Sequence, residues 1–243
     1  MKIKKIILNG FKRFTDLIIT DIPETARLIV LVGPNGSGKT SLFEALNFWY
    51  KIRGFNDRSQ QDYFNKKGGM ELNECRYDDK VIIEFYNNET PSNEQVKGKF
   101  YFRTAYRNEP DFMVSSLNKQ KNPTEAIKLA NLTQNDQTVS ENYQRLVAQT
   151  LTGVYDPLNN MKTVEQLREE LIGAIKCSLL GVFDNLSLSS IGDPLLNGSF
   201  YFEKGSTKDF HYKNLSAGEK SAFDLLLDIL IKSAYYSDGV FCI

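Results

Sequence analysis

The residues with the clearest chemical meaning form a glycine-rich loop near the N-terminus. Residues 33–40 match the pattern GxxxxGK followed by Ser or Thr in full. The glycines allow backbone N–H groups to curl around phosphate oxygens, at the positive end of the helix that follows. Lys39 would reach the β- and γ-phosphates of a nucleotide, and the Thr40 hydroxyl would ligate Mg²⁺. The predicted site for ATP and Mg²⁺ comprises Gly33, Pro34, Asn35, Gly36, Ser37, Gly38, Lys39, Thr40 and Ser41.

The segments on either side of this loop are the ones that such a site needs. Residues 27–32 are a continuous apolar run that is typical of a buried, parallel strand, and residues 42–50 are apolar almost all round, which predicts a buried helix. The order of strand, loop and helix favours a phosphate-binding loop over a glycine turn before an ordinary helix. Residues 4–11 and 17–22 predict two earlier strands, joined by a polar tip at residues 12–16.

The remaining chain alternates between strand-like and helical patterns. Strands are predicted at residues 80–86, 97–103, 186–191, 199–203, 210–213 and 239–243, of which the first two would form a hairpin around a loop at residues 87–93. Helices are predicted at residues 141–151 and 164–179, within a helical insert. A further helix after residue 214 carries on one face Phe223, Leu226, Leu227, Leu230 and Ile231.

A second chemically meaningful segment opens that last helix: Leu215, Ser216, Ala217, Gly218 and Glu219. Ser216 followed three residues later by Glu219 also fits a simple helix-capping box. The order along the chain is decisive, because a phosphate loop, an insert, this motif, an amphipathic helix and an apolar strand resemble the head of an ABC-type ATPase. The LSxGE form resembles the signature motif of the SMC, Rad50, RecF and OLD group. Residues 103–110 with 215–227 look most similar to ATPases of bacterial anti-phage systems of the OLD, Septu and retron-associated type.

The resemblance implies an α/β P-loop NTPase fold with an antiparallel β lobe and a helical insert lobe. It implies that two heads face each other, so that Ser216 and Gly218 of one head complete the phosphate site of the other. It also places the first hairpin near the nucleotide, with Lys12 or Arg13 as binding residues; a solvated hairpin tip is the alternative. The expected domains are residues 1–110 for the phosphate loop and β lobe, 111–185 for the insert and 186–243 for the signature lobe.

The sequence departs from the resemblance at its end. The chain stops within the apolar run at residues 239–243, and we expect it to be cut inside a strand. The acidic residues that activate water in this group, and hence the catalytic residues, would begin just after Ile243. His211, the only histidine, precedes the signature and does not replace the switch histidine of the group. Neither Gln120 nor Gln134 stands in a context typical of the Q-loop.

Composition and charge narrow the function classes. Thirty basic and thirty acidic residues cancel, so any DNA contact would be a local patch rather than a global basic field. Its candidates are Arg53, Arg58, Lys66 and Lys67, with a solvated loop as the alternative. Arg103 and Arg107 are candidates for a contact with phosphate or DNA, with surface ion pairs as the alternative. An odd set of cysteines without CxxC spacing, Cys75, Cys177 and Cys242, indicates a reducing cytoplasm. No apolar run is long enough to span a membrane.

These observations predict an ATP-binding and ATP-hydrolysing head that dimerises on ATP and gates a DNA-directed activity in genome maintenance or anti-phage defence. A nuclease or other effector subunit would be the partner. One alternative is an ATP-bound scaffold that regulates a toxin or effector complex. Another is the nucleotide-binding subunit of a membrane transporter, which the LSxGE form and the large insert disfavour.

Overall fold

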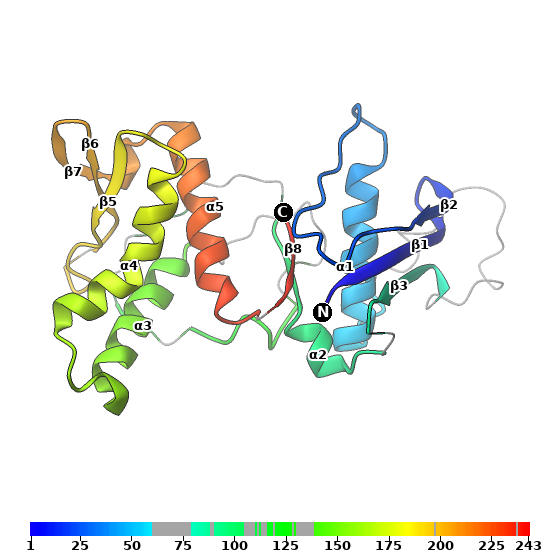
Figure 1. Ribbon diagram of the computed structural model, residues 1–243, viewed down its shortest axis with the longest axis horizontal. Coiled ribbons are helices and arrows are strands. Elements are labelled where there is room, and N and C mark those ends of the chain that lie inside the picture. The colour runs from blue at the N-terminus through cyan, green and yellow to red at the C-terminus, as the bar shows by residue number, and fades with distance from the viewer. Residues whose placement is uncertain are drawn as a thin grey trace. The chain divides into compact units, whose positions relative to one another are not determined.

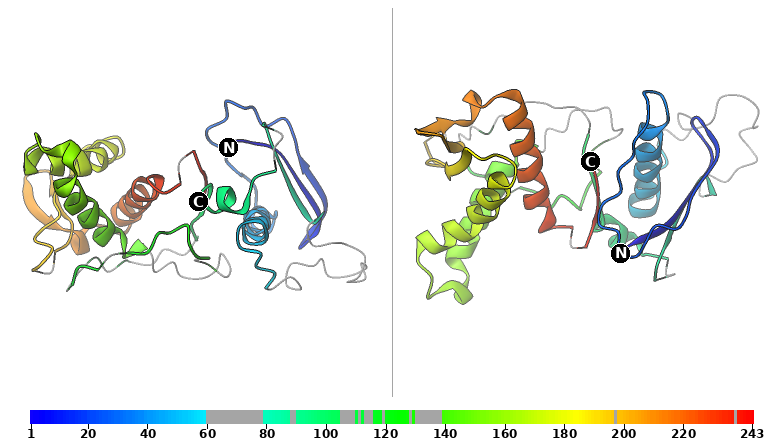
Figure 2. Two further views of the ribbon diagram at one scale, coloured as in Figure 1. Left: turned by 90° about the horizontal axis from the view of Figure 1, so that it is seen from below. Right: turned by 45° about the horizontal axis from the view of Figure 1, so that its top comes forward.

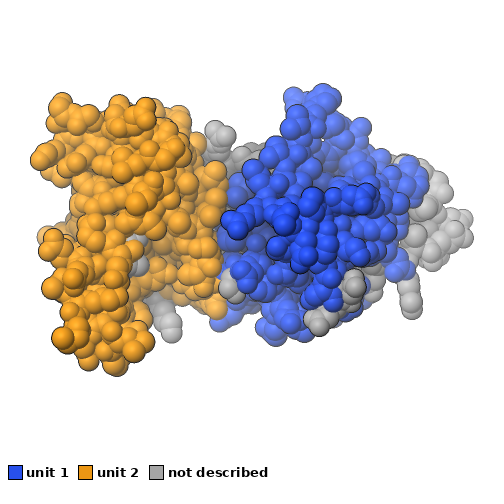
Figure 3. Space-filling model, in the orientation of Figure 1, with its two compact units in different colours: residues 1–105, 123–134, 236–243 blue, residues 106–122, 135–235 orange. Residues whose placement is uncertain are grey.

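The computed structural model divides the chain into two compact units (Figures 1 and 3). It describes residues 1–59, 79–87, 90–104, 110, 112, 116–118, 120–127, 129, 139–196, 198–236 and 238–243. Unit 1 contains residues 1–105, 123–134 and 236–243, and unit 2 contains residues 106–122 and 135–235. Each unit has its own buried apolar core. Unit 2 takes in most of the predicted helical insert and most of the predicted signature lobe.

The sheet of unit 1 is an antiparallel arrangement of three strands in the order β2-β1-β3. These are β1 (Ile3–Phe11), β2 (Phe14–Ile19) and β3 (Val81–Phe85). Leu8 in the central strand pairs with Leu17 of β2 and Val81 of β3. Because side chains alternate along a strand, Ile6 and Leu8 are buried together on one face. The first two predicted strands and the strand near residue 80 are confirmed.

Helix α1 (Lys39–Phe55) contacts this sheet (Figures 1 and 2). Its residues are apolar almost all round, and most of those from Leu42 onward are buried, as predicted. Phe48 packs on Phe11 of β1 with ring centroids 5.7 Å apart, and Trp49 packs on Phe85 of β3 at 5.8 Å. The helix that follows the phosphate loop is therefore anchored along its length in the core of unit 1.

The predicted hairpin between the strands near residues 80 and 100 is wrong. Ser92 and Gln95 form a capping box that begins a short helix, α2 (Asn93–Lys97), between the expected loop and the second expected strand. Strand β4 (Phe100–Phe102) then pairs in parallel with β8 (Val240–Cys242), while β3 pairs with β1. The expected strand at residues 239–243 is confirmed, although Ile243 is exposed.

The buried strand predicted at residues 27–32 is also wrong in this structure. The segment forms no strand, and Leu28 and Val32 are 80% and 90% exposed. Leu31 packs against the core of unit 1. A parallel strand of this composition needs a neighbouring strand on which to form its ladder, and neither described sheet of unit 1 pairs with it.

Unit 2 combines a three-stranded antiparallel sheet with helices. The strands are β5 (Leu186–Ser190), β6 (Tyr201–Lys204) and β7 (Thr207–His211), and the helices are α3 (Asn142–Tyr155), α4 (Val164–Leu180) and α5 (Ala217–Ser233). Two short 3₁₀ turns, Pro157–Asn159 and Tyr212–Asn214, precede α4 and α5. These elements confirm the predicted helices and strands of this region within a few residues.

The core of unit 2 lies around the middle of α5. Phe223 packs on Phe200 and Phe202 of the strand region with ring centroids 4.9 and 5.0 Å apart, and Leu227 and Ile231 continue the same buried face. Leu226 and Leu230 pack against the edge of this core. The described part of the chain contains no helix that is long and apolar enough to cross a membrane.

Candidate functional site

The glycine loop ends in a backbone conformation that only glycine adopts easily. Gly36 and Gly38 have φ values of 80° and 106°, and Gly38 is the N-cap of α1. The loop is closed by a hydrogen bond from the Ser37 amide to the Pro34 carbonyl at 3.2 Å. A Cβ atom on Gly38 would lie 2.5 Å from Cζ of Phe14. Any larger residue at 38 would therefore both strain the backbone and push the neighbouring ring away.

The Lys39 side chain lies over the loop that precedes it. Its ammonium donates hydrogen bonds to the carbonyl oxygens of Gly33 at 2.7 Å and Pro34 at 3.0 Å. The first turn of α1 holds no acidic residue, so the positive end of the helix is not offset there. Thr40 is exposed and Ser41 is half-buried in this same turn. A phosphate held by the loop would accept hydrogen bonds from Lys39 in place of the two carbonyl groups.

The tip of the β1–β2 hairpin packs on the loop. Cδ of Arg13 lies 2.9 Å from the position that a Cβ would take on Gly38, and one of its terminal nitrogens lies 3.8 Å from the corresponding position on Gly36. Lys12 instead forms an ion pair with Glu44 of α1. Of the two predicted hairpin residues, Arg13 thus borders the phosphate loop, whereas the charge of Lys12 is directed to the helix.

The residues around the loop fit a nucleoside triphosphate with its magnesium ion. Lys39, Arg13 and the N-terminus of α1 supply positive charge, and the side chains of Phe14 and Arg13 leave no room for a Cβ at Gly38. In the described part of the chain, no group of three or more His, Cys, Asp or Glu side chains could hold a metal ion. The predicted magnesium ligand in the described part of the chain is the Thr40 hydroxyl, together with phosphate oxygens.

The signature segment begins α5 with a complete capping box. Ser216 Oγ accepts a hydrogen bond from the Glu219 amide at 3.4 Å, and the Ser216 amide donates to Glu219 Oε2 at 2.9 Å. Leu215 is buried, while Ser216, Ala217 and Gly218 are exposed. Among the described residues, and apart from its chain neighbours and the backbone of its own helix, no atom lies within 4 Å of the position that a Cβ would take on Gly218. The N-terminus of α5 therefore presents a small, open and polar surface.

Lys204 of β6 forms an ion pair with Glu219, the second residue of the capping box. Its ammonium lies 2.8 Å from Glu219 Oε1. Burial alone would raise the pKa of Glu219, but hydrogen bonds from Lys204 and Ser216 outweigh it and hold the pKa below its ordinary value. Glu219 is therefore held as a carboxylate, and the first turn of α5 is tied to the sheet of unit 2.

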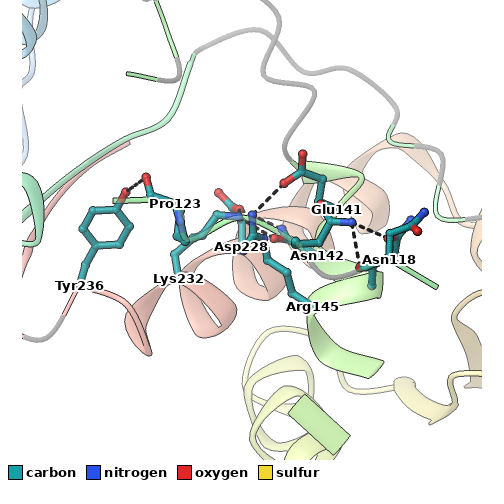
Figure 4. Close-up of polar contacts among 10 residues, drawn as sticks. Asn118, Pro123, Glu141, Asn142, Arg145, Asp228, Lys232 and Tyr236 are labelled. Carbon is teal, nitrogen blue, oxygen red and sulfur yellow. Dashed lines mark hydrogen bonds and ion pairs between the residues drawn. The ribbon is translucent and has the colours of Figure 1, made fainter. Parts of the chain in front are cut away.

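A buried polar stripe along α5 was not predicted from the sequence. Asp224 accepts a hydrogen bond from the Tyr212 hydroxyl at 2.9 Å, and Asp228 accepts one from the Asn142 amide of α3 at 2.9 Å. Lys232 donates to Asn142 Oδ1 at 2.9 Å (Figure 4). The signal in the sequence was the recurrence of charged residues at 224, 228 and 232, which share one helix face. The stripe connects α5 to α3.

Other predicted residues lie away from the phosphate loop or are engaged locally. Arg53 is exposed in the last turn of α1, and Arg58 is exposed just beyond it. The Arg103 amide donates to the carbonyl of Cys242 at 2.9 Å. Gln120 donates to Gln144 of α3 within unit 2. Predicted residues outside the described part of the chain are Lys66, Lys67, Cys75, Arg107 and Gln134.

His211 and the two described cysteines lie outside the phosphate loop. His211 ends β7, and its Nδ1 accepts a hydrogen bond from the Lys213 amide at 3.1 Å. Burial and the charge of Lys213 lower the pKa of His211. Cys177 is exposed, and burial raises the pKa of the Cys242 thiol to about 12. The thiol of Cys242 is therefore protonated at neutral pH and is a poor nucleophile.

Comparison with protein families identifies a family that covers most of the chain. A family model described as "AAA domain, putative AbiEii toxin, Type IV TA system" matches residues 28–243. No curated protein sequence matches the chain. The matched range covers most of the chain and includes both the phosphate loop and the signature segment.

Proposed function

Because the chain belongs to this AAA domain family, and is thus a P-loop ATPase domain of the α/β class, we propose that residues 33–41 bind ATP with Mg²⁺ and support its hydrolysis. The family match confirms the predicted P-loop ATPase. The closer assignment to the ABC-type heads of the SMC, Rad50, RecF and OLD group, and the head architecture that goes with it, are part of the proposal.

The observation that carries nucleotide binding is the placement of Lys39. Its ammonium is held over the loop by the carbonyl groups of Gly33 and Pro34, directly above the start of α1. The glycines at 36 and 38 turn the backbone with positive φ, as a loop that wraps phosphate requires. When bound, Mg²⁺ would neutralise developing charge on the phosphates, and the Thr40 hydroxyl is the described group placed to ligate it.

We further propose that the signature segment acts across a dimer. Ser216, Ala217 and Gly218 are exposed at a helix N-terminus, where backbone N–H groups and a hydroxyl can donate to the γ-phosphate held by a second copy. ATP would then join the two copies. The open surface at Gly218 supports this role, because a phosphate can approach the backbone there without meeting a side chain.

The cellular role that we propose is control of an effector in anti-phage defence or genome maintenance. The description of the family names a toxin of a type IV toxin–antitoxin system. This description supports the version of the proposed role in which an ATP-bound assembly regulates a toxin or other effector. A DNA-directed activity through a nuclease subunit is the other form, and stimulation of ATP turnover by a DNA duplex would favour it.

Light scattering with Mg²⁺ and a non-hydrolysable ATP analogue tests the proposal. The mass of the purified protein should double only with nucleotide. Lys39→Ala should abolish nucleotide binding, since the loop loses its one lysine. Ser216→Arg should bind nucleotide as a monomer and fail to dimerise, while Thr152→Arg, an exposed change on α3, should behave as the wild type. Dimerisation of Ser216→Arg would refute the trans role, and nucleotide binding by Lys39→Ala would refute the site.

A further inference from the structure

The tip of the β1–β2 hairpin is fixed by a charged contact with α1. Lys12 has a positive φ of 49°, and its ammonium forms an ion pair with Glu44. The two side chains are only 19% and 6% exposed. An ion pair that is largely removed from water is screened less than a surface pair, and it restricts both partners to one geometry. The contact joins the hairpin directly to the helix that begins at the phosphate loop.

The next residue in the hairpin, Arg13, is the one that lies on the loop. Its Cδ and one terminal nitrogen lie 2.9 and 3.8 Å from the Cβ positions constructed on Gly38 and Gly36. Arg13 itself is exposed, and among the described residues none is shown as an ion-pair partner of its guanidinium. A planar guanidinium matches phosphate oxygens with two parallel hydrogen bonds. The hairpin tip therefore brings a guanidinium to the edge of the phosphate loop.

We infer that Lys12 and Glu44 form a latch that holds Arg13 over the phosphate loop, so that Lys12 acts as a positioning residue and Arg13 as the residue that contacts phosphate. This inference depends on the proposed ATP site. It divides the two hairpin cations, which are adjacent in sequence, into different roles. Lys12 strengthens nucleotide binding only through Arg13, because its own charge is engaged by Glu44 on α1.

The ring of Phe14 completes the arrangement. It is half-buried, packs against the core of unit 1, and its Cζ lies 2.5 Å from the Cβ position constructed on Gly38. The hairpin tip is thus fixed on one side by an ion pair and on the other by an aromatic contact with the loop. Loss of the ion pair would release the Lys12 side of the tip while the Phe14 side remains packed.

A double-mutant cycle on nucleotide affinity tests the latch. Arg13→Met should weaken ATP binding by roughly tenfold or more, because the hydrogen bonds from a guanidinium to phosphate are charge-assisted. Lys12→Met should cause a similar loss, and Lys12→Met combined with Arg13→Met should lose no more than Arg13→Met alone. The double variant Lys12→Glu with Glu44→Lys exchanges the two charges, and its affinity for ATP should be higher than that of Lys12→Glu alone. Additive losses, an unaffected Lys12→Met, or a charge exchange without recovery would each overturn the latch.

Two controls separate this inference from other effects. Lys5 of β1 pairs with Glu84 of β3 at 3.6 Å, so Lys5→Met removes a lysine ion pair from the same hairpin and should leave ATP affinity unchanged. Melting temperatures of all variants show whether a loss of affinity reflects unfolding, and the coupling to Arg13 distinguishes positioning from general destabilisation. Lys39→Ala tests the ATP site itself, and ATP binding by this variant would refute the proposed function. If Lys39→Ala does not bind ATP but Lys12→Met binds it with unchanged affinity, only the latch is refuted.

Discussion

The ammonium of Lys232 donates a hydrogen bond to the side-chain carbonyl of Asn142 at 2.9 Å, and neither residue has any exposed surface (Figure 4). The amide of the same Asn142 donates to Asp228 at 2.9 Å. Asn142 therefore donates to one buried charge, Asp228, and accepts from another, Lys232, and these two residues lie one helical turn apart on α5. Lys232 and Asp228 themselves are 3.9 Å apart, so the asparagine provides the shorter contacts.

Asn142→Ala should destabilise unit 2 by about 3 kcal/mol, because two buried charged groups each lose a hydrogen-bond partner. Equilibrium denaturation with urea measures the change. Thr152→Ala is the matched control on α3, since Thr152 is exposed and its hydroxyl only donates to the Ala148 carbonyl of its own helix. A loss below about 1 kcal/mol for Asn142→Ala would show that the asparagine is replaceable by water or by rearranged neighbours.

Val32 gives a direct test of the difference between the sequence prediction and the structure. The sequence places it in a buried strand, but its side chain is 90% exposed. Val32→Thr should change the free energy of unfolding by no more than about 0.5 kcal/mol, because the side chain is exposed. Burial of the threonine hydroxyl in an apolar strand would cost about 1–3 kcal/mol. Val81→Thr, at a position 2% exposed in β3, provides the buried reference.

The contrast between residues 27–32 and the rest of the chain shows which features local patterns determine. Glycine spacing, helical periodicity and the Ser216–Glu219 capping box depend on residues close in sequence, and the structure has the expected helices at α1, α4 and α5. Strand pairing depends on distant residues. Nothing near β4 indicates that its partner is β8, more than a hundred residues later, and the apolar run at 27–32 carries no information on which strand would pair with it.

In the candidate site, too, the sequence predicts the local features but not the contacts between distant residues. The loop sequence identifies Lys39 and its glycines, and the hairpin sequence indicates Lys12 and Arg13 together as candidates. Only the structure separates them, since Glu44 pairs with Lys12 and leaves Arg13 beside the loop. The stripe of Asp224, Asp228 and Lys232 has helical spacing, but the same spacing is typical of a solvated helix face. Burial against Tyr212 and Asn142 comes from tertiary packing, which the sequence pattern does not specify.

The capping box of α5 predicts a dependence of stability on pH. The pKa of Glu219 is lower in the folded protein than its ordinary value of 4.5, so its carboxylate stabilises the fold above that pH, and the contribution is lost as the pH falls through the folded pKa. Glu219→Gln should therefore lower the melting temperature at pH 7 and make less difference at about pH 3.5. Glu203→Gln, an exposed change on β6, should show no such pattern. An equal loss at both pH values would contradict the assignment.

Gly218 separates the stability of α5 from its proposed role in the dimer. The position is exposed in the first turn and does not have a positive φ. Among the described residues, no atom beyond its own helix backbone and chain neighbours lies within 4 Å of a constructed Cβ. Gly218→Asp should stabilise the helix by about 0.3–1 kcal/mol, because a negative charge complements the helix N-terminus. The same charge should repel the γ-phosphate of a second copy and abolish nucleotide-dependent dimerisation. Gly218→Ala adds the Cβ without the charge and should retain more dimer. If the Gly218→Asp variant melts higher and still dimerises on ATP, the N-terminus of α5 does not face phosphate.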